Sequence, residues 1–417
     1  MKGIFRNKNI MLLIFGRSTS IFGDVMLMTA LALHVLKITN SPKAFGTIMA
    51  IAYIPRLIFS SFSGAIVDRI PKKKLMILLD FARGVALIGI LIFNNYSLPI
   101  IYLVILTFAI ADTFFIPASV SVIPKIVPLE DRKDVNSIDQ TIDNSLNVIS
   151  PLIASALYVS GGLFVIVLVD AITFIVSAIS EMLLTFDDTI SEKKGKIAKD
   201  MLSVFKLLKE DIRVGSLVVN GALTHLFLIP FIEVGIISLL LVTFKSPEIH
   251  YGIVRATISV ATILAGFLAF AIKDKDVSKN INIGILGILT SVFFFAIVIF
   301  TPVVDLMSRS VNLPVIYLSM ACFVMFLSFG FYAVFFRTFY QTEVPENMLG
   351  RFISVFIIFI SLSRIIGMYV YGILFESYPV WIPILILGVG MLLKLIVHIP
   401  FLKEEQRINR GNIDLNI

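Results

Sequence analysis

The run from Ile281 to Val304 contains no charged residue. At about 1.5 Å per residue it is long enough to cross the hydrocarbon core of a bilayer, which is about 30 Å thick. A helix buried in a soluble core rarely runs so far, and similar stretches recur along all 417 residues. Because 58% of the residues are hydrophobic and only 15% charged, the chain holds more apolar surface than one soluble core can bury. The sequence therefore predicts a membrane protein.

The apolar stretches predict an all-α, polytopic fold of twelve transmembrane helices in two six-helix halves. We expect an N-terminal half at residues 1–186, a central cytoplasmic loop at 187–213, a C-terminal half at 214–402 and a cytoplasmic tail at 403–417. The predicted spans are Ile10–Leu36, Ala44–Val67, Leu75–Phe93, Ile100–Val122, Val135–Tyr158, Gly161–Phe186, Val214–Phe244, Tyr251–Ile272, Ile281–Val304, Pro314–Tyr340, Phe352–Glu376 and Val380–Leu402.

Positive charge alternates between the connections. Of the 35 lysines and arginines, 24 lie at the termini, in the central loop and in every second connection, whereas 4 lie in the opposite connections and 7 within spans. Short loops rich in lysine and arginine remain cytoplasmic. Both termini are therefore expected inside the cell, which requires an even number of spans, in the plasma membrane of a bacterium.

The central loop has two open interpretations. Its apolar residues recur with a helical period at Ile197, Met201, Val204, Phe205 and Leu208, as in an amphipathic helix lying along the membrane surface. A solvated linker joining the two halves is equally compatible with its lysines and glutamates.

Several classes of function are excluded or disfavoured. The net charge of +7 lies mostly in short loops, where it sets topology, so no nucleic-acid partner is expected. A single cysteine, Cys322, forms neither a disulfide framework nor a metal cluster. No phosphate-binding Gly-Lys-Ser/Thr loop or nucleophile elbow occurs, so we expect neither an enzyme nor an ATP-driven pump, and no metal or cofactor.

The most specific motif joins the second and third spans and reads Gly64-Ala-Ile-Val-Asp-Arg-Ile-Pro-Lys-Lys-Lys74. Gly64 permits close helix contact. The carboxylate of Asp68 at a helix end can meet a helix N-terminus or a basic partner, forming a latch that breaks when the two halves move. A charged turn that only fixes topology is the alternative.

This segment resembles the G-x-x-x-D-R-x-x-[RK]-[RK] loop of the major facilitator superfamily. Its matching residues, the expected conformational latch, are Gly64, Asp68, Arg69, Lys72 and Lys73. The resemblance extends over nearly the whole chain and implies a transporter that works by alternating access. Short motifs such as Gly16-Arg17, Gly23-Asp24 and Pro117-Ala118 are similar to the macrolide-efflux and siderophore-exporter branch.

Two features depart from that pattern. Pro71 stands where the family often has glycine, which stiffens the turn. The Gly-Pro-rich motif that drug antiporters carry in the fifth span is replaced here by Asn147–Ser155, in which Ser and Ala stand for the glycines. This substitution weakens the antiporter assignment.

Asp24 and Glu233 lie in the middle of the first and seventh predicted spans, at equivalent positions in the two halves. A charged side chain costs roughly 2.5–3.5 kcal/mol at the bilayer centre, so each should face a partner or a water-filled cavity. A carboxyl group removed from water binds a proton more readily. The resemblance implies that these spans line the central cavity, where the acids could couple transport to protons; a structural ion pair, for instance between Asp24 and Arg17, is the alternative.

Asp112 lies in the middle of the fourth predicted span, which the resemblance implies also lines the cavity. Its candidate partners are Arg17, Arg56, Arg337 and Arg364. Asp80 and Arg83, three residues apart, are expected to pair locally.

Asp139 and Asp143 share one helix face, repel each other, and therefore require a basic partner, as expected of a cytoplasmic gate. His225 could form a relay with Glu233, although about 12 Å of helix separates them. Lys394 and Arg255 are expected to reach the membrane interface.

The resulting hypothesis is a secondary transporter that exports small amphipathic or hydrophobic, drug- or macrolide-like compounds, by proton antiport and as a monomer. An uncoupled facilitator or a lipid or siderophore exporter remains an alternative. A membrane receptor or assembly factor that has lost transport is an alternative of another class.

Overall fold

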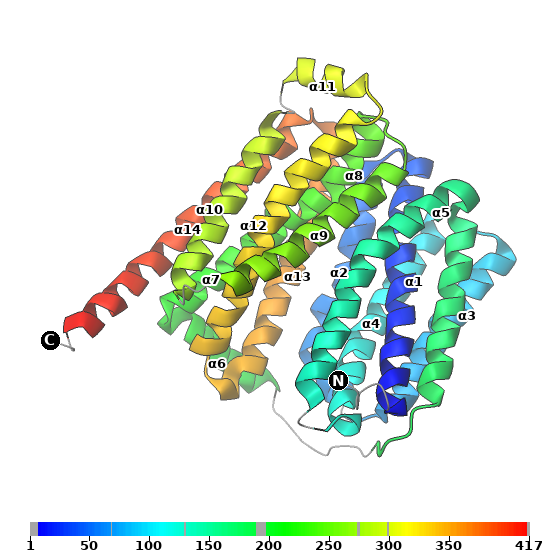
Figure 1. Ribbon diagram of the computed structural model, residues 1–417, viewed down its shortest axis with the longest axis horizontal. Coiled ribbons are helices and arrows are strands. Elements are labelled where there is room, and N and C mark those ends of the chain that lie inside the picture. Colours follow the sequence, from blue (N-terminus) through cyan, green and yellow to red (C-terminus); the bar gives the residue numbers. More distant parts are fainter. Residues whose placement is uncertain are drawn as a thin grey trace. The chain divides into compact units, whose positions relative to one another are not determined.

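The computed structural model describes residues 7–67, 69–128, 131–188, 197–272, 276–297 and 300–414, and every regular element in these ranges is a helix (Figure 1). The helices are α1 (Lys8–Thr39), α2 (Pro42–Val67), α3 (Lys72–Phe93), α4 (Leu98–Ile126), α5 (Arg132–Met182), α6 (Ile197–Glu210), α7 (Ile212–Leu223), η3 (Thr224–Leu228), η4 (Phe231–Gly235), α8 (Ile236–Ser238), η5 (Leu239–Thr243), α9 (Ile249–Ala271), α10 (Val277–Ala296), α11 (Thr301–Ser308), α12 (Leu313–Glu343), α13 (Glu346–Ser377) and α14 (Trp381–Asp414).

The predicted all-α polytopic fold is confirmed. Ten helical stretches of the described residues are long and apolar enough to cross a membrane. One of them, Val135–Met182, is interrupted at Gly162, whose φ of 64° and ψ of −162° only glycine adopts readily. The chain turns back there, as Figure 1 shows beside the label α5. With these two limbs counted separately and the 26-residue α2 added, the described chain has twelve helical segments of a length that can cross a membrane.

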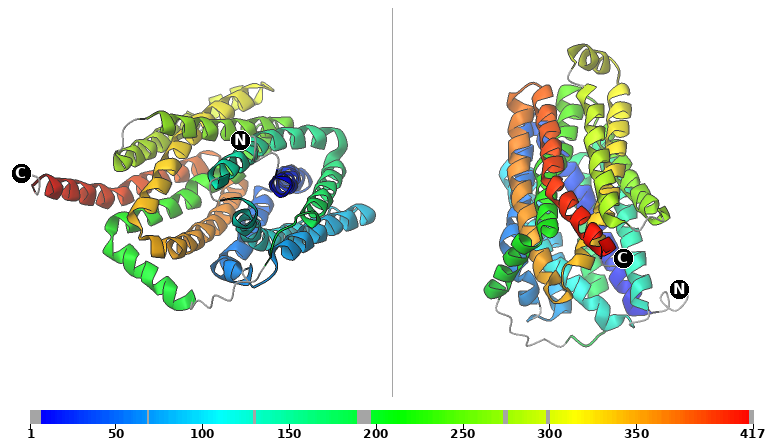
Figure 2. Two further views of the ribbon diagram at one scale, coloured as in Figure 1. Left: turned by 60° about the horizontal axis from the view of Figure 1, so that its bottom comes forward. Right: turned by 90° about the vertical axis from the view of Figure 1, so that its left-hand side faces the viewer.

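The ninth and the last predicted spans differ most from the structure. The ninth span was expected at Ile281–Val304, but α10 starts at Val277, capped by the Asp276 carboxylate, and ends at Ala296, before the separate helix α11. The last helix was expected to end at Leu402, but α14 continues to Asp414 and extends away from its neighbours in Figure 2. Glu405, in this extension, forms an ion pair with Arg213, which gives the added turns a fixed contact.

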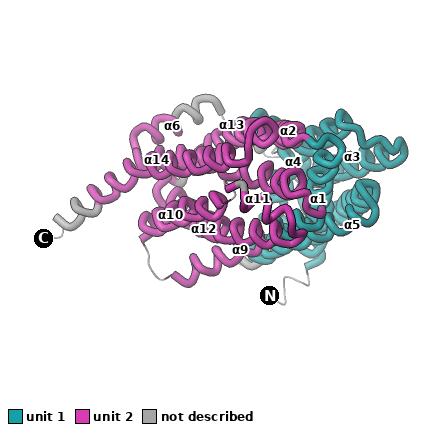
Figure 3. The backbone as a smooth tube through the Cα atoms, turned by 90° about the horizontal axis from the view of Figure 1, so that it is seen from above, with its two compact units in different colours: residues 1–40, 54–195, 248–256 teal, residues 41–53, 196–247, 257–417 magenta. Residues whose placement is uncertain are grey.

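The described residues fall into two compact units, coloured separately in Figure 3. Unit 1 comprises residues 1–40, 54–195 and 248–256, and unit 2 comprises residues 41–53, 196–247 and 257–417. In unit 1, one end of the helices packs around a hydrophobic cluster that includes Ile10, Met76, Phe115 and Val135.

The central segment forms a helix where the structure describes it, α6 (Ile197–Glu210). Val204 is fully buried, whereas Lys206 and Lys209 are exposed, and the ring of Phe205 lies 6.3 Å from that of Phe359 in α13. The amphipathic-helix interpretation of this part of the loop is therefore supported.

The seventh membrane helix alternates between α and π turns around Pro230. Proline has no amide hydrogen, so the carbonyl of Leu226, four residues earlier, loses its usual helical partner. A Cβ atom added at Gly367 of α13 would lie 2.4 Å from that carbonyl oxygen. Glycine at 367 therefore allows α13 to lie directly against the irregular part of the helix.

We expect Gly367→Ala to lower the thermal stability of the detergent-solubilised protein, because backbone must move to admit the methyl group, at a cost of about 1–3 kcal/mol. Gly266→Ala is the matched control, since nothing lies within 4 Å of its added Cβ. Alanine there should leave stability unchanged or raise it by up to about 1 kcal/mol. Equal melting temperatures for the two variants would contradict this account.

Candidate functional site

Six ionisable side chains of unit 1 come together between four helices, and we call them the acidic cluster. Its members are Asp24 of α1, Asp80 and Arg83 of α3, Asp112 of α4, and Asp170 and Glu181 of α5.

Arg83 is the centre of the acidic cluster. One guanidinium nitrogen donates to Asp80 Oδ1 at 2.7 Å and another to Asp112 Oδ1, also at 2.7 Å. The predicted local pair of Asp80 and Arg83 is confirmed. The four arginines expected as partners for Asp112 were wrong, because Arg83, on the neighbouring helix α3, takes that role.

Aromatic rings enclose the same guanidinium. Its central carbon lies 4.6 Å from the ring centroid of Phe174, 5.1 Å from that of Phe115 and 5.9 Å from that of Phe108. These rings exclude water while still attracting the positive charge through their faces. Arg83, with 2% of its surface exposed, is thereby fixed in a dry environment.

Four acids of the cluster have a buried carboxyl oxygen without a hydrogen-bond donor in the described part of the chain. These oxygens are Oδ1 of Asp24, Oδ2 of Asp80, Oδ2 of Asp170 and both oxygens of Glu181. Gly23 brings Asp170 against α1, because a Cβ there would lie 2.2 Å from Asp170 Oδ1. Asp24 also lies within electrostatic range of Asp112, Arg83 and Asp80.

The chemistry of the acidic cluster follows from its charge. Five carboxyl groups surround one guanidinium in the described structure, and a buried ionised carboxylate without a donor is costly. A protonated carboxyl removes that cost. The arrangement is therefore suited to holding protons, and Asp24, half-buried on α1, is its member in the predicted cavity position.

Arg17 lies seven residues before Asp24 and does not take the role of its counter-ion. Its guanidinium donates to Asp139 and, at 2.6 Å, to Asp143 Oδ2, both on the first limb of α5. The basic partner predicted for this pair of aspartates is thus Arg17. The three residues join α1 to α5 within unit 1, but their role as a gate remains a prediction.

The expected latch is only partly visible. Asp68 lies outside the described residues, as do the surroundings of Gly64 in α2, and Arg69 is exposed. Lys72 is buried, and Lys73 donates through Nζ to the carbonyl of Leu184 at 2.7 Å.

Asp188, which sequence reasoning missed, joins the same region to α4. Its carboxylate accepts the backbone N–H of Lys73 at 2.9 Å and Nζ of Lys125 at 3.1 Å. Burial alone would raise the pKa of Asp188, but these hydrogen bonds hold that pKa below its ordinary value. The lysines of the motif therefore bind the connection that follows α5.

In unit 2, the acid predicted at the matching position, Glu233, is half-buried in the π turn η4. His225 does not face it through Nδ1, which accepts a hydrogen bond from Arg364 Nε at 2.9 Å. Arg364 also donates to the hydroxyl of Tyr53. The polar contacts of His225 thus lead to Arg364.

The position of Lys394 differs from the one expected at the membrane interface. It does not reach an interface: it is 1% exposed, its Nζ donates to Thr224 Oγ1 at 2.6 Å, and it lies 3.8 Å from the ring centroid of Tyr332. Asn220 donates to the Lys394 carbonyl at 3.0 Å and accepts from the Tyr332 hydroxyl. Lys394 is therefore part of a buried polar network.

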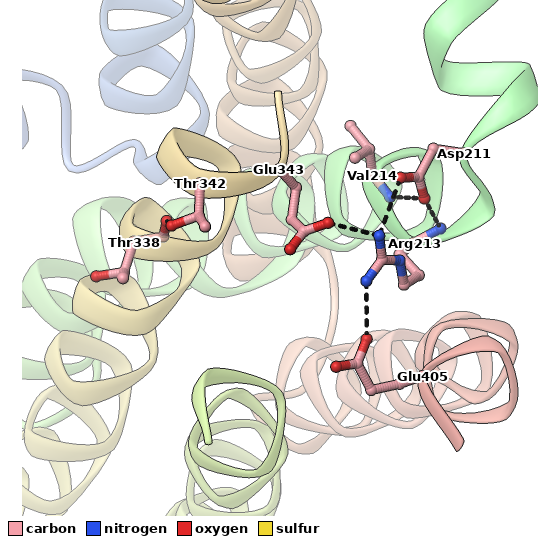
Figure 4. Close-up of polar contacts among 7 residues, drawn as sticks. All are labelled: Asp211, Arg213, Val214, Thr338, Thr342, Glu343 and Glu405. Carbon is pink, nitrogen blue, oxygen red and sulfur yellow. Dashed lines mark hydrogen bonds and ion pairs between the residues drawn. The ribbon is translucent and has the colours of Figure 1, made fainter. Parts of the chain in front are cut away.

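A second group of ion pairs lies at the ends of helices in unit 2. Arg213, at the start of α7, pairs with Asp211, with Glu343 at the end of α12 and with Glu405 in the α14 extension, at 3.4, 2.5 and 3.1 Å (Figure 4). One guanidinium thus holds the ends of three membrane helices together.

Comparisons with known proteins decide the family. A sequence profile described as Major Facilitator Superfamily matches residues 13–368. The chain belongs to this superfamily. This superfamily member is 21% identical, over 85% of its length and 86% of the relative's, to Macrolide efflux protein A of Streptococcus pyogenes. It is also 27% identical to a putative bacilysin exporter of Bacillus subtilis (strain 168), over 51% of its own length and 52% of the exporter's.

Solved structures support the same fold. A bacterial homologue of the iron transporter ferroportin superimposes with a TM-score of 0.70 at 15% identity, covering 96% of this chain and 98% of that one. A bacterial homologue of the human lysosomal transporter Spinster superimposes with a TM-score of 0.69 at 14% identity, covering 95% of this chain and 98% of that one. The protein is thus an integral membrane transporter of the major facilitator fold, and its family is not one of enzymes.

Proposed function

We propose that this major facilitator protein exports small amphipathic or hydrophobic compounds and couples their export to proton entry by alternating access. The observation that carries the proposal is the acidic cluster, in which Asp24, Asp170 and Glu181 have buried oxygens without donors. Such groups bind and release protons when their access to water changes. The named relatives, a macrolide efflux protein and a putative bacilysin exporter, favour export of amphipathic molecules.

In this proposal, Asp24 is the proton carrier and Arg83 its electrostatic regulator. Protonation of Asp24 reduces the negative charge of the cluster, so it weakens the attraction that holds Arg83 between Asp80 and Asp112. Glu233 provides a second carboxyl on the transport path. Arg17, with Asp139 and Asp143, serves as a gate that opens as the helices move.

The experiment is transport by purified protein in proteoliposomes, with a radiolabelled macrolide and the dye rhodamine 6G as probes. An imposed pH gradient should accelerate accumulation of at least one probe several-fold, and an uncoupler should abolish the acceleration. Equal rates with and without the gradient would refute proton coupling, and failure to move either probe would refute export of this class.

We further propose that both termini and the central segment face the cytoplasm, on the charge asymmetry of the loops. In a Cys322→Ala background, Asp187→Cys should react with an impermeant maleimide only after cells are permeabilised, whereas Ser310→Cys, in the exposed turn after α11, should react in intact cells. The reverse pattern would invert the topology.

A further inference from the structure

A pocket of about 210 Å³ opens within unit 2 between α7, η3, α12 and α13. Its lining includes Thr224, His225, Tyr332, Phe336, Arg337 and Phe356. It shares no lining residue with the acidic cluster, and none of its lining residues within the described chain is acidic.

One wall of the pocket is aromatic. The ring of Phe336 lies 5.4 Å from that of Phe356, with 36° between their planes, and 5.5 Å from that of Tyr332, with 37° between them. Gly221 makes room for this arrangement, because a Cβ there would lie 2.7 Å from the Phe356 ring. Aromatic rings prefer offset-stacked or edge-to-face contacts, so this wall can pack against a further planar ring.

The polar groups of the pocket favour a negatively charged ligand. Arg337 is exposed on the lining, and among the described residues its guanidinium has neither an ion pair nor a hydrogen bond. Behind the lining, Lys394 contacts two lining residues, through its hydrogen bond to Thr224 and its position over the Tyr332 ring. A lining that holds an arginine and, among its described residues, no carboxylate attracts anions.

We propose that this pocket binds a planar aromatic anion, such as an arene carboxylate, with its ring on the face of Phe336 and Phe356 and its acid group at Arg337. Sites for whole drug-sized ligands usually measure roughly 300–1,000 Å³, so this smaller space fits one ring system with its acid. A larger transported molecule would place only its aromatic acid group in this pocket. The proposal rests on the proposed export function only in regarding the ligand as cargo.

The test is equilibrium binding to the purified full chain in detergent, using three probes of one shape: 2-naphthoate, its neutral amide, and the cationic 2-naphthylmethylammonium. We expect naphthoate to bind about tenfold more tightly than the other two, as one good ion pair in a partly dry pocket allows. Arg337→Gln should reduce naphthoate to the affinity of the amide and leave the amide unchanged. Arg309→Gln, which removes an exposed arginine outside the pocket, is the control.

Equal or tighter binding of the amide or the cation, undetectable naphthoate binding, or an equal loss in both arginine variants would overturn the proposal. Because this measurement needs no pH gradient, its outcome is independent of proton coupling. Failure here with gradient-driven transport intact removes only the anion pocket, and naphthoate binding without gradient-driven transport removes only the proton mechanism.

Discussion

Arg83→Gln should destabilise the protein by about 3–5 kcal/mol, which is the usual cost of breaking a buried ion pair from one side. The variant removes the donor of two 2.7 Å hydrogen bonds and leaves Asp80, which is fully buried, without its counter-charge. Thermal unfolding in detergent, followed by size-exclusion chromatography, measures the loss.

The rescue variant makes this prediction specific. Replacing Arg83 by Gln together with Asp80→Asn and Asp112→Asn removes the pair and its orphaned charges at once, and should restore most of the lost stability. Arg309→Gln serves as the control for loss of an exposed arginine. If Arg83→Gln melts like the wild type, or if the triple variant is no more stable than the single one, the acidic cluster is not organised by Arg83.

Asp24→Asn should uncouple transport without abolishing it. Asparagine keeps the size of the side chain but neither gains nor loses a proton, so acceleration by a pH gradient should fall about tenfold or more, while exchange of labelled for unlabelled substrate stays within about twofold. Glu233→Gln tests the second proposed carboxyl in the same assay. Both are measured in proteoliposomes with the macrolide and dye probes.

Asp305→Asn is the matched control, because Asp305 is an exposed acid on α11 and should not affect coupling. If Asp24→Asn responds to the gradient as the wild type does, Asp24 is not the coupling residue. Loss of exchange as well as gradient response would instead indicate a structural role for this carboxyl.

The pattern of hydrophobic residues was sufficient to predict most of the fold. Length and composition were sufficient for twelve spans, because every span must satisfy its own backbone in hydrocarbon. Even the reversal inside α5 falls at the paired glycines with which the sixth predicted span begins. The errors lie where a polar group decides the boundary, as with the capping carboxylate of Asp276 and the ion pair of Glu405.

Less of the candidate site could be predicted from the sequence. Pairs on one helix, such as Asp80 with Arg83, follow from spacing, but partners on different helices depend on packing that one sequence does not specify. Asp112 was therefore assigned to the wrong arginines. Asp170, Glu181 and Lys394 were either missed or assigned to an interface, although a charge inside an apolar run was a usable signal for each.

In the proposed mechanism the acidic cluster holds an exchangeable proton on a buried carboxyl, and infrared spectroscopy tests this without any substrate. In a pH titration of the purified protein, the carbonyl stretch of a protonated carboxylic acid should persist to near-neutral pH, disappear as the solution becomes alkaline, and weaken in Asp24→Asn but not in Asp305→Asn. A wild-type spectrum with no such band above acidic pH, or a band unaffected by Asp24→Asn, would contradict the account.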